Sequence, residues 1–136
     1  MHLKKKYGST YIQIEKDFSN TDIYKIYNYN KNDSMDIVLA KTIKYFGQAI
    51  KKISPDLVVI HGDRVETLAA TIHCNLNNIL TCHIEGGEVS GTVDESIRHA
   101  TTKLSHIHFV SNLKAKNILK RMGEVDKNIY ITGSPE

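Results

Sequence analysis

The spacing of apolar and polar positions changes along the chain. Residues 1–33 are polar and rich in Lys, Asn and Tyr, and the pattern there predicts only a short strand around Ile23–Tyr27. Over residues 34–53, apolar side chains recur every three or four positions, which predicts an amphipathic helix with Ser34 as its N-cap. Pro55 ends this helix, because the residue before a proline avoids the helical region of backbone space.

From residue 57 onward, short apolar runs alternate with helical patterns. The predicted strands are 57–61, 80–84, 107–110 and 128–132, and the predicted helices between them are 64–76, 93–104 and 112–122. This alternation predicts an α/β fold with a parallel sheet that is covered by helices on both faces.

Composition excludes several classes of function. The net charge is only +3 and no finger motif or basic-aromatic pattern accompanies it, so we expect no nucleic-acid partner and place lysines 4–6 on a solvated surface. No apolar run is long enough for a membrane span. Cys74 and Cys82 do not form a C-x-x-C pair, which indicates a reducing compartment and predicts a cytoplasmic protein.

Polar clusters follow the first two predicted strands. His61-Gly62-Asp63-Arg64 comes after the first, and the Gly-rich stretch 85–91 comes after the second. Ligands bind at the carboxyl ends of parallel strands, so we expect a site there. Each acid also has a structural interpretation: Asp63 as a turn residue or N-cap, and Glu85 as a solvated carboxylate.

The helix that follows the Gly-rich stretch carries further candidates. Thr92 and Glu95 fit a capping box, in which Asp94 would only complement the helix dipole. Asp94 and Arg98 are four residues apart on one helix face, as are Glu95 and His99. We therefore expect Arg98 to hold Asp94 in place, to lower its pKa, or to bind an anionic substrate.

Metal and cofactor motifs are weak in this sequence. His106 and His108 have a ligand-like spacing, but no third ligand follows at a recognised distance, so we expect no metal. Neither a Walker-type phosphate loop nor G-x-G-x-x-G is present, so we expect no nicotinamide or other cofactor.

Three stretches together resemble a known enzyme family: HGDR at 61–64, HIEGGEVSGT at 83–92 and DESIRHATTKL at 94–104. They are similar to the hydrolysing UDP-N-acetylglucosamine 2-epimerases of sialic-acid synthesis, and the E-A-G-x-R loop of the non-hydrolysing branch is missing. Weaker matches lie at residues 2–3, 7–10 and 131–135.

The resemblance implies a GT-B-type enzyme of two Rossmann-like three-layer domains. Residues 1–136 would be a partial N-terminal domain, with the opening strand before Met1 and the C-terminal, UDP-binding domain after Glu136. The expected reaction converts UDP-N-acetylglucosamine and water to N-acetylmannosamine and UDP by elimination and hydration. The full-length enzyme is expected to be a homo-oligomer, and this chain alone an inactive or incomplete fragment.

The family motifs also imply roles for individual residues. Asp63, Glu85, Asp94 and Arg98 match catalytic positions, and the favoured assignment gives proton transfer to the two aspartates and charge stabilisation to Glu85. The residues expected to bind substrate are Arg64, His61 and His83. Two alternatives stay open, namely a non-catalytic α/β remnant that acts as a binding module and an epimerase for UDP-diacetamido sugars of the legionaminic-acid type.

Overall fold

A computed structural model describes residues 3 and 8–135 of the chain. Lysines 4–6 and part of the weak family match at residues 2–3 and 7–10 lie outside the described residues. The elements are α1 (Tyr11–Asp17), α2 (Met35–Ile53), β1 (Leu57–His61), α3 (Val65–Leu76), β2 (Leu80–Ile84), α4 (Val93–Lys103), β3 (Ile107–Val110), α5 (Leu113–Arg121), a short 3-10 turn (Asp126–Asn128) and β4 (Ile129–Ile131).

The predicted elements from residue 34 onward are confirmed to within one or two residues. Ser34 takes the N-cap position of α2 as expected, and Ser54 ends the helix in a left-handed conformation. The strand predicted around Ile23–Tyr27 is wrong, because this stretch has no regular secondary structure. It runs alongside α2, to which Asn28 is tied by a hydrogen bond from its Nδ2 to Thr42 Oγ1 at 2.7 Å.

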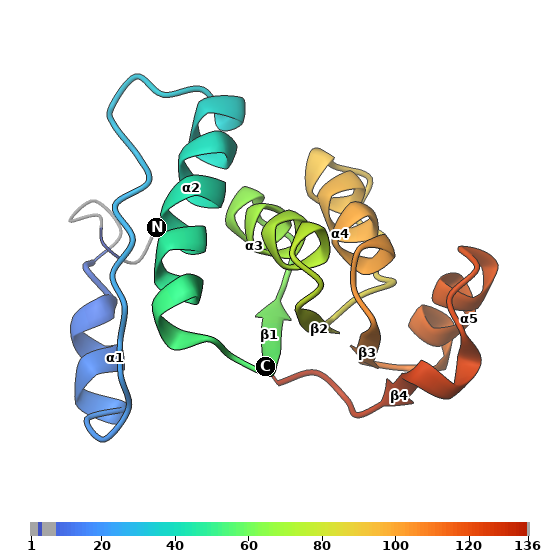
Figure 1. The fold of residues 1–136 in the computed structure, drawn as a ribbon. Helices are drawn as coiled ribbons and strands as arrows, with labels where there is room; N and C mark the ends of the chain where they lie inside the picture. Colours follow the sequence, from blue (N-terminus) through green and yellow to red (C-terminus); the bar gives the residue numbers. More distant parts are fainter. Residues whose placement is uncertain (1–2, 4–7, 136) are drawn as a thin grey trace.

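The sheet has four parallel strands in the order β1-β2-β3-β4 (Figure 1). In register, His61 at the end of β1 pairs with Ile84 at the end of β2, and Ile84 pairs with Phe109 on β3. The carboxyl ends of all four strands therefore form one edge of the sheet, and the loops that leave them are brought together there.

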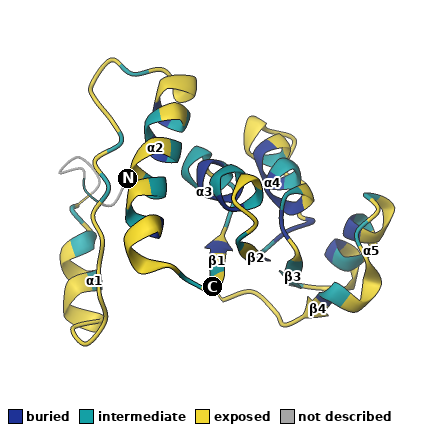
Figure 2. Ribbon diagram, in the orientation of Figure 1, coloured by how far each residue is buried: buried dark blue, intermediate teal, exposed yellow. Residues whose placement is uncertain are grey.

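Helices α3, α4 and α5 connect successive strands and cover one face of the sheet, as right-handed crossovers between neighbouring strands require. Val110 and Ile129 of this face pack with Ala115 and Leu119 of α5 into a buried apolar cluster. Burial is concentrated in α3, α4, β2 and β3, whereas α1 and the segment after it are mostly exposed (Figure 2). These packed helices therefore support the sheet behind its carboxyl edge.

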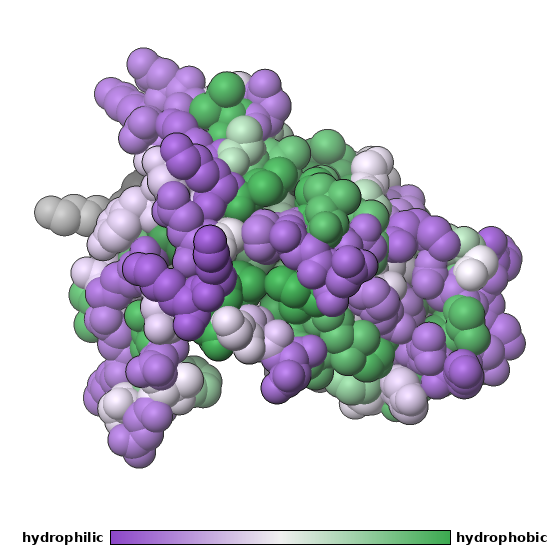
Figure 3. All heavy atoms as spheres, viewed as in Figure 1, coloured by the Kyte–Doolittle hydropathy of each residue, from purple (hydrophilic) through white to green (hydrophobic). Residues whose placement is uncertain are grey.

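The second face of the sheet is less covered than the alternating pattern predicted. Leu57 and Leu80 pair in register on this face and both are 42% exposed, while Val59 and Tyr130 are at least half exposed. Hydrophobic surface is visible across the middle of the molecule between polar ends (Figure 3). Coverage of both faces is thus only partial in the described residues.

Within that same described part, no helix combines the length and the apolar character needed to cross a membrane.

Candidate functional site

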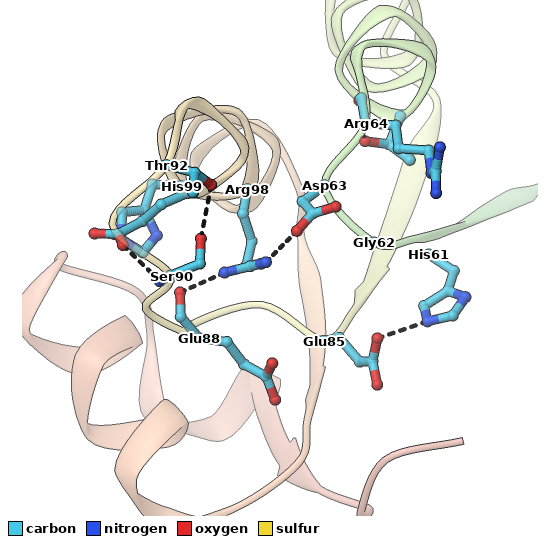
Figure 4. Close-up of polar contacts among 12 residues, drawn as sticks. His61, Gly62, Asp63, Arg64, Glu85, Glu88, Ser90, Thr92, Arg98 and His99 are labelled. Atoms are coloured by element: carbon cyan, nitrogen blue, oxygen red, sulfur yellow. Dashed lines mark hydrogen bonds and ion pairs between the residues drawn. The ribbon is translucent and has the colours of Figure 1, made fainter. Parts of the chain in front are cut away.

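The carboxyl ends of β1 and β2 bring the two predicted polar clusters together, as the strand pattern indicated. His61 and Asp63 leave β1, Glu85 leaves β2, and Arg98 reaches the same place from α4 (Figure 4). A cavity of about 520 Å³ adjoins this edge and is lined by His61, Glu66 and Thr67 together with the segment 23–29.

Glu85 is held by two neighbours. His61 Nε2 lies 2.7 Å from Glu85 Oε2, and Ser134 Oγ donates to Glu85 Oε1 at 2.5 Å. The Ser134 hydrogen bond, with a further contribution from His61, keeps the pKa of Glu85 below its usual value. The carboxylate stands between the serine and the histidine, so this is not the arrangement of a serine nucleophile with its base.

The backbone at Glu85 is also unusual. Its φ is +67°, a left-handed conformation that costs a non-glycine residue about 1 kcal/mol. The amide of Glu85 donates to the carbonyl of Phe109 at 2.9 Å, which anchors this conformation to β3. Left-handed residues of this kind are concentrated at functional sites, where the surrounding structure holds them in place.

Arg98 is buried and forms a bridge between two loops. Its Nη1 donates to the carbonyl of Glu88 at 2.7 Å, and its Nη2 forms an ion pair with Asp63 Oδ2. The expected pairing of Arg98 with Asp94 is not what the structure has. Asp94 is exposed in the first turn of α4, whereas the guanidinium turns inward, where Asp63 and a carbonyl complement it.

The start of α4 is capped differently from the predicted box. Thr92 is the N-cap, as expected, but Glu95 reaches past it and accepts from the amides of Ser90 and Gly91 at 2.7 and 2.6 Å. These backbone hydrogen bonds lower the pKa of Glu95. The expected neighbour His99 lies 3.7 Å from Glu95. Glu95 therefore closes the Gly-rich loop onto the first turn of α4.

His83 is fully buried beneath the loop. Its Nε2 is 3.0 Å from the carbonyl oxygen of Gly62 and its Nδ1 is 3.0 Å from Thr102 Oγ1. Burial lowers the pKa of His83 to about 4. Both ring nitrogens are thus occupied by protein groups.

Arg64 and Ser134 lie at the same carboxyl edge of the sheet. Arg64 occupies the N-cap position of α3 and its side chain points away from the Asp63–Arg98 pair (Figure 4). Ser134 was missed by the motif analysis of the acids, although it follows β4 and so leaves the sheet at the same carboxyl edge. Its place directly after a predicted strand was the sequence feature that could have identified Ser134 as a residue of this edge.

His106 and His108, which the sequence offered as a weak metal pair, have protein partners. His106 Nδ1 accepts from the amide of Thr81 at 3.2 Å, and His108 Nε2 lies 3.2 Å from Glu124 Oε2. Among residues 3 and 8–135, no three His, Cys, Asp or Glu side chains are grouped so that they could hold a metal ion.

Comparison with known proteins adds identity to this geometry. A family model described as UDP-N-acetylglucosamine 2-epimerase matches residues 1–136. A UDP-N-acetylglucosamine 2-epimerase of Neisseria meningitidis is 47% identical over 137 residues, and a hydrolysing UDP-N,N'-diacetylbacillosamine 2-epimerase of Legionella pneumophila is 42% identical over 137. These matches cover 100% and 99% of this chain, which spans only 36% of the length of each relative.

Solved structures agree with the sequence relatives. A UDP-GlcNAc 2-epimerase from Neisseria meningitidis, bound to UDP-GlcNAc, matches with a TM-score of 0.84 and 24% identity over 93% of this chain and 35% of that chain. The Methanocaldococcus jannaschii enzyme in complex with UDP-GlcNAc and UDP matches with a TM-score of 0.76 and 26% identity, over 90% of this chain and 34% of that chain. These similarities confirm the predicted Rossmann-like α/β fold of the GT-B type. The chain belongs to the UDP-N-acetylglucosamine 2-epimerase family.

Proposed function

We propose that this chain carries the acid–base part of the active site of a hydrolysing epimerase that converts UDP-N-acetylglucosamine and water to N-acetylmannosamine and UDP. The observation that carries the proposal is that the His61–Glu85 hydrogen bond and the Asp63–Arg98 ion pair lie together at the ends of adjacent parallel strands. They do so in a chain that the family model matches from end to end.

The reaction explains the need for several carboxylates. A base removes the proton at C2 of the sugar while the C1–O bond breaks and its electron pair leaves with UDP, which gives a 2-acetamidoglucal. Water then adds its hydroxyl to C1, and C2 receives a proton on the opposite face. One group must take a proton, another must return one, and a carboxylate must stabilise positive charge at C1 as it develops.

Glu85 suits the role of charge stabiliser. A group in that role must remain ionised throughout the reaction, and the hydrogen bond from Ser134 together with His61 favours the ionised form of Glu85. Its left-handed backbone fixes the direction in which the carboxylate leaves β2.

Proton transfer is assigned to Asp63 and Asp94. Asp63 is partly exposed and pairs with Arg98, so its carboxylate is held at the edge of the sheet. Asp94 lies in the exposed first turn of α4, close in sequence to the Gly-rich loop. We assign contact with UDP to Arg64 and contact with the sugar to His61.

A related substrate is the second candidate. Two hydrolysing relatives that act, by name, on diacetylbacillosamine nucleotides are 42% and 38% identical to this chain. The acid–base part of the site serves either sugar, because the reacting atoms at C1 and C2 are the same. A non-catalytic binding module is the remaining alternative.

The wider setting follows from the same proposal. Residues 1–136 form part of an N-terminal domain whose full-length protein is a homo-oligomer in the cytoplasm and supplies sialic-acid-type sugar synthesis. The described cysteines, Cys74 and Cys82, are buried free thiols, which suits a reducing compartment.

The test replaces the matching 36% of the Neisseria meningitidis relative with this chain and measures release of UDP from UDP-N-acetylglucosamine. We expect turnover by the chimaera, deuterium at C2 of the product in heavy water, and loss of turnover in Asp63→Asn and Glu85→Gln. The 136-residue chain alone is expected to release no UDP. A folded chimaera that is active only on the diacetamido sugar favours the second candidate, and one inactive on both sugars favours the binding module.

A further inference from the structure

The turn between β1 and α3 is fastened to β2 at a single residue. The amide of Gly62 donates to the carbonyl of Ile84 at 3.3 Å, and the carbonyl of Gly62 lies 3.0 Å from His83 Nε2. Gly62 has a φ of +88°, which glycine adopts without strain. Asp63 is the next residue, so whatever fixes Gly62 also fixes the point from which Asp63 meets Arg98.

The hydrogen-bonding partners of His83 determine where its proton is. A backbone carbonyl can only accept, so Nε2 must carry the hydrogen that binds Gly62. In the neutral ring Nδ1 then has a free lone pair, and it accepts from the hydroxyl of Thr102. The side chain is 0% exposed, and burial disfavours the charged form of the ring. In the charged form Nδ1 would also carry a hydrogen and could no longer accept from the Thr102 hydroxyl.

The Gly-rich loop is shaped around this hydrogen bond. A Cβ added at Gly86 would lie 2.8 Å from Thr102 Oγ1 and 3.1 Å from His83 Nδ1, so a side chain at this position would push the two partners apart. Glycine at position 86 therefore allows the loop to close over the His83–Thr102 pair without disturbing it.

We propose that His83 is a positioning residue, an imidazole that links Thr102 of α4 to the carbonyl of Gly62 and so sets the position of Asp63. This differs from the expectation that His83 binds substrate, because both nitrogens are already engaged. The proposal rests on the proposed function only in giving Asp63 a role in the reaction.

The first test is nuclear magnetic resonance of the 136-residue chain without substrate. The ring nitrogens of His83 are expected to show the Nε2–H tautomer, unchanged from neutral pH down to about pH 5.5, since the pKa lies near 4. A ring that carries its proton on Nδ1, or that titrates near its ordinary value, would overturn the proposal.

The second test uses two substitutions that each keep one nitrogen position. His83→Gln places an amide near Nε2 and is expected to keep the hydrogen exchange of the Gly62 amide at its original rate. His83→Asn imitates only Nδ1, so we expect exchange at Gly62 to become about fivefold faster, the factor that one neutral hydrogen bond supplies. Equal exchange rates in the two variants would contradict the assignment.

A matched pair at Thr102 guards against failure of the histidine variants to fold. Thr102→Ser keeps the hydroxyl and should leave the His83 signals in place, whereas the isosteric Thr102→Val should shift them. Unshifted His83 signals in Thr102→Val would refute the link between Thr102 and His83.

In the chimaera, His83→Asn should lower kcat about tenfold or more with little change in KM, and His83→Gln should restore kcat. If the exchange rate of the Gly62 amide changes as expected but the Asp63→Asn chimaera still releases UDP, the proposed function fails while the positioning of the turn by His83 stands.

Discussion

Acidification should destabilise this fold through His83 before it affects the carboxylates. The pKa of His83 falls from 6.5 to about 4, chiefly through burial, with smaller contributions from His108, Arg98 and His61. The unfolded chain therefore takes up the proton first as the pH falls, so the stabilisation is present above about 6.5 and is lost towards 4. The shift corresponds to a loss of roughly 2 kcal/mol between about pH 7.5 and 5, and of about 3 kcal/mol by pH 4.

Urea unfolding followed by circular dichroism at several pH values measures this loss. The matched control is His83→Gln, whose stability should fall about 2 kcal/mol less than that of the original chain between about pH 7.5 and 5. Burial lowers the pKa of His108 as well, but that contribution is common to both proteins and cancels in the comparison. The lowered pKa of Glu85 has its effect only below about 4.5, where protonation removes its stabilisation. Parallel curves for the two proteins would refute the reasoning.

Three further substitutions test the site and the core by the same unfolding measurement. Asp63→Asn leaves the buried Arg98 with only a carbonyl as its partner and should lower the free energy of unfolding by about 2–3 kcal/mol. This is somewhat below the value for a fully buried pair, because Asp63 is 28% exposed. A loss of stability under about 0.5 kcal/mol would contradict this, and adding Arg98→Met should recover part of the lost stability. Asn112→Ala removes the side-chain cap that accepts from the amide of Ala115 at 3.0 Å and should cost about 1 kcal/mol; no change would mean that solvent replaces the cap. Leu119→Ala empties a fully buried position and should cost about 2–5 kcal/mol, unless the cluster collapses into the space.

Local patterns were sufficient for most of the architecture. The strands 57–61, 80–84 and 107–110 appear with their predicted bounds because each is a short apolar run between polar turns. The α1 helix was not predicted from the polar N-terminal segment, since none of its residues is buried and its apolar positions leave no clear stripe. The carboxyl-edge rule then predicted where the candidate site lies without any knowledge of side-chain contacts.

The partners within the site depended on tertiary structure. Helical spacing predicted that Asp94 pairs with Arg98. In the structure the buried guanidinium instead pairs with Asp63, which is 35 residues away in sequence. Glu85 meets Ser134 across 49 residues because β4 returns the chain to the same edge of the sheet.

The sequence by itself determined the order of strands and helices, the parallel sheet and the edge where the acids gather, because these follow from local periodicity. Only the tertiary structure decided which acid pairs with Arg98, that His83 is buried under the loop, and that Ser134 binds Glu85. The physical reason is desolvation, since a buried charge or ring nitrogen takes whichever partner the converging loops place beside it.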